Sequence, residues 1–119
     1  MIEPAQMSLT IRRNATFDPI FLWKDEDGDA IDLTGCTVEL TVKDSANTRA
    51  AKLHLISSNT DGMLVVDPTA GRISANVPPT HLTKLKASAL VFDLRVSFPN
   101  GYVAVIAEGS ANVIAGVTE

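Results

Sequence analysis

The chain has 119 residues, a mass of 12.7 kDa, a net charge of −4 and one cysteine. This length is enough for one compact domain around a single core, and a mean hydropathy of +0.15 argues against a disordered tail. The longest uncharged apolar run covers residues 103–107, far short of the ~20 residues of a membrane span. We expect no secretory signal, because the start of the chain lacks a basic and an apolar region. The acidic balance argues against nucleic acid and membranes as partners, and a lone cysteine excludes an intrachain disulfide.

Alternation of apolar and polar residues with a period of two predicts an all-β domain. Turn signals separate the alternating segments, as in a sandwich or barrel. We therefore expect a single domain over residues 1–119, with about eight antiparallel strands and residues 1–7 as an N-terminal arm. The expected strands cover residues 8–13, 17–24, 37–43, 51–56, 63–66, 72–77, 90–98 and 102–114, with a bulge or bend at Gly109.

The inward-facing positions of these segments predict the core. One short helical turn is expected in residues 79–86, because Leu82 and Leu85 share a face there, and we expect it to cross the end of a sandwich. The residues expected to be deeply buried are Leu40, Val42, Ile73, Phe92, Leu94 and Val96.

An acidic turn at residues 25–29 is the first candidate site. Counted from its first aspartate, the segment does not fit an EF-hand loop, because the sixth position is not glycine and the twelfth is not glutamate. We favour a solvated hairpin turn whose charges discourage edge-to-edge pairing of sheets, and we expect no metal. A calcium site of another kind is the alternative, and it would use Asp25, Asp27, Asp29 and Asp32.

Residues for acid–base or nucleophilic chemistry are few and scattered. His54 and His81 lie far apart in the sequence, and Cys36 opens an inward-facing strand, which favours a small buried residue. The chain contains no catalytic motif, so we expect no enzyme and no cofactor. A small hydrolase on a β-sandwich is a further alternative, and it would depend on His81.

Several segments are apolar on both faces, although a sandwich strand has only one core face. Residues 102–107 are the clearest case, and residues 20–23 and 63–66 are similar. We expect the face of residues 102–107 that lies outside the core to touch another chain, and either face fits the pattern. The alternative is that alanine and valine are tolerated on a strand surface. The expected interface residues are Tyr102, Val103, Val105, Val113, Ile114 and Val117.

Two motifs carry a resemblance to a known family. They are DxxGxxIDLTG at residues 25–35 and FDLxxxFPNG at residues 92–101, and GRI at residues 71–73 and EGS at residues 108–110 accompany them. Over residues 8–118 the chain resembles the small immunoglobulin-like proteins and domains of tailed bacteriophages and prophages, such as the N-terminal domain of the phage baseplate upper protein. The resemblance implies an immunoglobulin-like β-sandwich without catalytic residues.

The resemblance also implies a structural, non-enzymatic component of a phage virion. Because the chain ends at Glu119 without a fibre or lectin domain, we expect an adaptor or decoration protein of the tail, baseplate, connector or head surface. Its partners would be other phage structural proteins, with repeated copies in a symmetric assembly. It would be made in the bacterial cytoplasm and end in the virion. The alternative is a carbohydrate-binding module for host attachment, which would use Trp23 and Tyr102.

Overall fold

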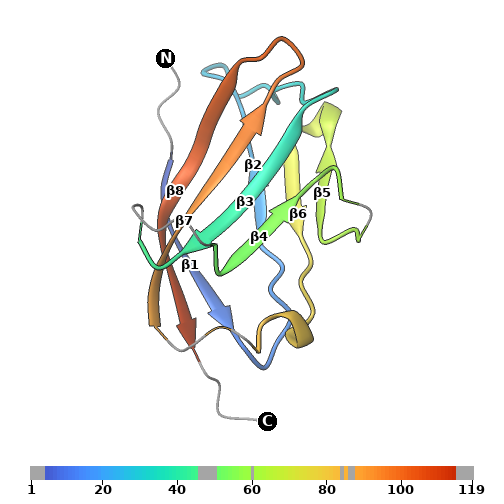
Figure 1. The fold of residues 1–119 in the computed structure, drawn as a ribbon. Coiled ribbons are helices and arrows are strands. Elements are labelled where there is room, and N and C mark those ends of the chain that lie inside the picture. Colours follow the sequence, from blue (N-terminus) through green and yellow to red (C-terminus); the bar gives the residue numbers. More distant parts are fainter. Residues whose placement is uncertain (1–4, 46–50, 60, 84, 86–87, 115–119) are drawn as a thin grey trace.

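The computed structural model describes residues 5–45, 51–59, 61–83, 85 and 88–114. These residues form two packed sheets, as Figure 1 shows, so the predicted sandwich is confirmed. The larger sheet has the strand order β1-β8-β7-β3-β4, and the smaller has the order β2-β6-β5. The elements are β1 Ala5–Arg12, β2 Ile20–Leu22, β3 Thr37–Lys43, β4 Leu53–Ile56, β5 Leu64–Asp67, the 3₁₀ helix η1 Pro68–Ala70, β6 Arg72–Ala75, the 3₁₀ helix η2 Pro79–His81, β7 Ser88–Ser97 and β8 Val103–Ile114.

The core lies between the sheets and follows the period-two pattern. Along β3, buried side chains alternate with half-buried ones, and Val38, Leu40 and Val42 point inward. Ile73 of β6 in the smaller sheet belongs to the same buried cluster. All the residues expected to be deeply buried are at most 3% exposed, which confirms that prediction. Burial of these apolar side chains is the main favourable term in folding.

The first strand differs from the prediction in two ways. β1 begins at Ala5, so residues 5–7 belong to the sheet and not to an N-terminal arm. β1 also runs parallel to β8, whereas the other strand pairs are antiparallel. A fully antiparallel sandwich was therefore a wrong prediction for this pair. Alternation does not distinguish the two directions, because side chains alternate with the same period in both.

The bulge in the β7–β8 pair lies at Ile106 and not at the expected glycine. Leu94 and Arg95 of β7 pair with Ala107 and Val105, which leaves Ile106 as the extra residue of β8. Ile106 and Ala107 are neighbours in the sequence, yet they are only 8% and 3% exposed. An extra residue reverses the alternation of the strand beyond it. Even-numbered residues of β8 therefore face the core before the bulge, and odd-numbered ones face it afterwards.

Gly109 has a different function in the same strand, because it lets β1 approach β8. A Cβ atom at this position would lie 1.9 Å from the carbonyl oxygen of Met7, and the φ angle of Gly109 is +151°. Only glycine combines this backbone angle with so close an approach of another main chain.

The second strand is shorter than expected, and one short helical turn lies within residues 79–86, as expected. β2 covers only Ile20–Leu22 and begins directly after Pro19, which has no N–H to donate to a ladder. Pro79–His81 form the 3₁₀ helix η2, and Leu82 and Leu85 beyond it are buried. The described part of the chain contains no helix long and apolar enough to cross a membrane.

Candidate interaction surfaces

The structure decides which face of residues 102–107 lies outside the core. Ala104 and Ile106 point inward and are 4% and 8% exposed. Val103 is 49% exposed on the other face, Val105 is half-buried beside it, and Tyr102 just before the strand is 47% exposed. We call Val103 and Val105 the β8 patch. Tyr102 pairs with Phe98, and its ring contacts the ring of Phe98, which packs against the core, so Tyr102 lies on the side of Ala104 and Ile106 at the end of the sandwich.

The C-terminal part of the expected interface is divided between core and surface. Val113 is only 5% exposed and belongs to the core cluster, so the prediction that it contacts another chain is wrong. The bulge at Ile106 is the physical reason, because it reverses the alternation and turns Val113 inward. Ile114 is 40% exposed at the end of β8, and Val117 lies outside the described residues.

Trp23 and Tyr102 lie at the two ends of a row of aromatic rings. The ring centroids of Trp23 and Phe98 are 6.0 Å apart, and those of Phe98 and Tyr102 are 5.7 Å apart, in both cases with tilted planes. Trp23 and Phe98 are partly buried and pack against the core. A ligand ring stacks on an exposed aromatic face, so Tyr102 is the better of the two predicted carbohydrate contacts.

The acidic turn brings three of the four candidate carboxylates together. Ligand atoms of Asp25, Asp27 and Asp29 lie within 4.8 Å of one another, and all three residues are exposed. Asp25 Oδ1 accepts hydrogen bonds of 2.9 Å from the N–H groups of Asp27 and Asp29, an arrangement typical of aspartate in tight turns. Asp32 is not part of this group. Its carboxylate accepts hydrogen bonds from the hydroxyl (2.6 Å) and the N–H (3.0 Å) of Thr34, which lower its pKa.

Polar contacts join the strands on the outer face of the larger sheet. Glu39 of β3 accepts hydrogen bonds of 2.9 Å from Nε2 of His54 on β4 and from Nη2 of Arg95 on β7. These two contacts lower the pKa of Glu39, and that with His54 has the larger effect. At the other edge, the hydroxyl of Ser110 donates a hydrogen bond of 3.1 Å to Ser8 on β1. The polar groups in these contacts have partners, so this part of the face is stable in contact with water.

The outer face of the smaller sheet carries exposed apolar side chains that were not among the expected interface residues. Ile20 and Leu22 of β2 are each 61% exposed, and Val65 of β5 is 51% exposed. Ile20 and Val65 both pair with Ser74 of β6, so they lie in one row across the sheet. We call Ile20, Leu22 and Val65 the small-sheet patch. The sequence signal was present, since segments 20–23 and 63–66 are apolar on both faces.

The residues with catalytic potential lie apart in the described part of the chain. His54 contacts Glu39 on the outer face of the larger sheet, and His81 is exposed in η2. Cys36 is half-buried, and burial, together with the nearby Asp32 carboxylate, raises the pKa of its thiol. A raised pKa keeps a thiol protonated and weakly nucleophilic. The hollow beside Cys36, about 360 Å³ in volume, is lined by neither a histidine nor an acidic residue.

The similarity of the chain to known proteins lies in its fold. No protein-family model and no curated protein matches the chain. Extracellular domains 3–5 of Drosophila OTK share 15% identity with it at a TM-score of 0.42, over 93% of this chain and 34% of that one. CopC from Methylosinus trichosporium OB3b shares 10% identity at a TM-score of 0.39, over 97% and 89% of the two chains. Tim-1 shares 8% identity at a TM-score of 0.43, over 100% and 99%. The chain thus spans about a third of the OTK fragment, and its own strands form a β-sandwich of two sheets.

Proposed function

We propose that the chain is a structural, non-enzymatic interaction module that occupies a fixed place in a larger protein assembly. The observation that carries this proposal is the exposure of large apolar side chains on both outer faces of the sandwich, in the β8 patch and the small-sheet patch. Exposed apolar side chains cost free energy in water, and they become the centre of an interface when a partner covers them.

The sequence resemblance favours a tailed bacteriophage particle as that assembly, with the chain as an adaptor or decoration protein. A virus particle repeats one contact by symmetry. A small apolar patch on each domain is then sufficient, because many copies engage at once and their contacts add up. The mixture of a polar outer face and two limited apolar patches suits such a domain, which has to stay folded before it assembles.

Replacement of Val103 by lysine tests this function. Val103 is 49% exposed, so the free energy of unfolding of the purified variant should lie within about 0.5 kcal/mol of that of the parent chain. Assembled phage particles should nevertheless lose the chain, because a lysine cannot enter an apolar interface without a partner for its charge. The double variant with lysine at Val105 is stronger, but Arg95 lies opposite Val105, and part of its effect would be local repulsion.

The matched control is Asn112→Lys, which adds the same charge at an exposed position of the same strand. Particles with this variant should carry the chain at its normal copy number. A normal copy number of the Val103→Lys variant would refute the β8 patch as an interface. Absence of the parent chain from purified particles would refute the function itself.

The exposure of Tyr102 favours one second candidate, a carbohydrate-binding module. Tyr102 is 47% exposed at the end of an aromatic row that packs against the core. A structural module should show no binding on a glycan array. Binding that is lost in Tyr102→Ala and kept in Trp23→Phe would favour this second function over the first.

A further inference from the structure

β1 is an edge strand of unusual length for this domain. It is the outermost strand of the larger sheet and pairs only with β8. The other edge strands are short, because β4 and β5 have four residues each and β2 has three. β1 has eight residues, and none of them is charged before Arg12. Proteins usually shorten, charge or cover such an edge, since its main chain pairs readily with other strands.

The direction of the main-chain groups of β1 follows from its contacts with β8. The N–H of Arg13 donates to the carbonyl of Ile114 at 3.0 Å, and the carbonyl of Met7 faces Gly109. Odd-numbered residues therefore bond to β8, and even-numbered ones direct their N–H and C=O groups away from it. The carbonyl of Arg12 already accepts the N–H of Ala15. The residues that leave both groups on the open side are Gln6, Ser8 and Thr10.

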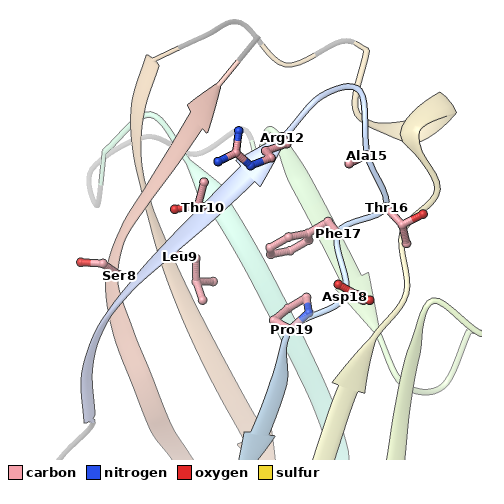
Figure 2. A pocket seen from close by; sticks show the side chains of 9 residues that line it. All are labelled: Ser8, Leu9, Thr10, Arg12, Ala15, Thr16, Phe17, Asp18 and Pro19. Atoms are coloured by element: carbon pink, nitrogen blue, oxygen red, sulfur yellow. The ribbon is translucent and has the colours of Figure 1, made fainter. Parts of the chain in front are cut away.

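A groove runs along this open side, between the edge of β1 and the edge of the smaller sheet. A hollow of about 420 Å³ lies between the start of β1, at Ala5 and Met7, and residues 21–24. A second hollow of about 380 Å³ lies between the later part of β1 and residues 15–19, and Figure 2 shows Leu9 and Phe17 between these two walls. No backbone hydrogen bond crosses the groove between β1 and residues 16–24 in the described part of the chain.

We propose that the open edge of β1 pairs with β1 of a second copy of this chain, antiparallel and about a twofold axis at Ser8. Ser8 of one copy then faces Ser8 of the other, and Gln6 faces Thr10, so each outward N–H and C=O group gains a partner. Met7, which is 38% exposed, lies beside Leu9 of the second copy on the groove side. This pairing goes beyond the proposed function, because it uses a different surface and joins the chain to itself.

The charges along the groove complement one another in this arrangement. Lys24 lines the hollow at the Ala5 end, and Asp18 lines the hollow at the other end, and both residues are exposed. A twofold axis at Ser8 places the Ala5 end of one copy's groove beside the opposite end of the other copy's groove. Lys24 of each copy therefore approaches Asp18 of the other. Arg12 lines the same hollow as Asp18 and is the last residue of β1, one position beyond residues 5–11 that face one another about this axis, so no like charges meet within the strand pair itself. Complementary charges of this kind select one partner and one register.

Sedimentation of the purified chain tests the pairing, because it measures the dimer dissociation constant directly. Lys24→Asp and Asp18→Lys should each weaken the dimer by about tenfold or more, since each variant brings like charges together. The combined variant should restore it, because the two charges are only exchanged. The matched control exchanges Lys52 and Asp44, an exposed pair at 3.5 Å near β4, and should leave the dimer unchanged.

Cross-linking tests the register of the strand pair. In a Cys36→Ser background, Ser8→Cys should form a disulfide between copies, because facing residues of such a pair have Cα atoms about 5.5 Å apart. Ser110→Cys is the control. Ser110 lies next to Ser8 on β8, about 4.8 Å further from the axis in each copy, so two cysteines at this position are too far apart to form a disulfide. A chain that stays monomeric at every concentration would overturn the proposal, and so would a combined charge variant that fails to restore the dimer or a cross-link at residue 110 in place of residue 8. Binding of a different protein strand by a chain that does not pair with itself would equally overturn it.

Discussion

The two outer faces of the sandwich satisfy their side chains in different ways. On the larger sheet, Glu39 links three strands through His54 and Arg95. On the smaller sheet, Ile20 and Leu22 stand 61% exposed on a strand of three residues. A polar face whose groups bond one another is stable in water, whereas an apolar face gains free energy when another surface covers it.

This difference shows which parts of the surface are stable in water and where a partner would gain most free energy by burying apolar side chains. In the described part of the larger sheet, a partner would bury apolar side chains at the β8 patch and would pair main-chain groups at the open edge of β1. The smaller sheet is narrow, and its exposed apolar residues lie on its two edge strands, with Ile20 and Val65 in one row on either side of Ser74. An interface is therefore expected at limited places and not over a whole face, and each of the following changes tests one part of that comparison.

The largest effect is expected in the core that the two sheets share. Leu94 on β7 is fully buried, so Leu94→Ala should cost about 2–5 kcal/mol of the free energy of unfolding. Val65→Ala on the exposed face of the smaller sheet is the control and should cost less than about 0.5 kcal/mol. Urea unfolding measures both. Two separate transitions, one for each sheet, would contradict a single shared core.

Gly109→Ala should have the next largest effect, and it acts on the larger sheet alone. The added methyl group would meet the Met7 carbonyl, and the positive φ angle would be strained, at a cost of about 1–3 kcal/mol. Hydrogen exchange should accelerate in β1 before the rest of the sheet. Ser110→Ala, the next residue, removes only one surface hydrogen bond and should cost about 1 kcal/mol or less. Equal stability of Gly109→Ala and the parent chain would disprove the close approach.

Glu39→Gln tests the polar contacts of the larger sheet and should cost about 1 kcal/mol or less at neutral pH. Hydrogen bonds from His54 and Arg95 lower the pKa of Glu39 below its ordinary value of 4.5 in the folded state. The unfolded chain then binds the proton more readily, so this contribution is present above about pH 4.5 and is lost as the pH falls through the folded pKa. Unfolding measured between about pH 2.5 and 6 should show a shallower loss of stability in the variant. An unchanged pH dependence would mean that these contacts do not stabilise the carboxylate.

The smallest effect on stability is expected for Ile20→Thr and Leu22→Thr in the small-sheet patch. Each should change the free energy of unfolding by about 0.5 kcal/mol or less, because these side chains are mostly in water already. Both should reduce the binding of a hydrophobic dye to the folded domain. Val103→Thr makes the same comparison for the β8 patch. A strong loss of stability would show that the small-sheet patch supports the fold and is not a free surface.

Local alternation predicted the inner faces well, because the pleat of a strand sends successive side chains to opposite sides. Residues 37–43 were expected as a strand and form β3 with the same bounds. The prediction failed for Val113, since one extra residue at Ile106 reverses the alternation of everything after it in β8. Periodicity placed the two-faced apolar segments correctly, and it left open which of their faces is covered.

The sequence by itself determined the number of strands, most of their positions and the residues that fill the core. These properties depend on local periodicity and on turn residues such as Asn100 and Gly101 between β7 and β8. Only the tertiary structure decided that β1 joins the larger sheet parallel to β8, where Gly109 meets Met7, and that its outer edge stays open. Such contacts join residues from opposite ends of the chain, and no local pattern specifies them, because the pairing of distant strands depends on how all the others have already packed.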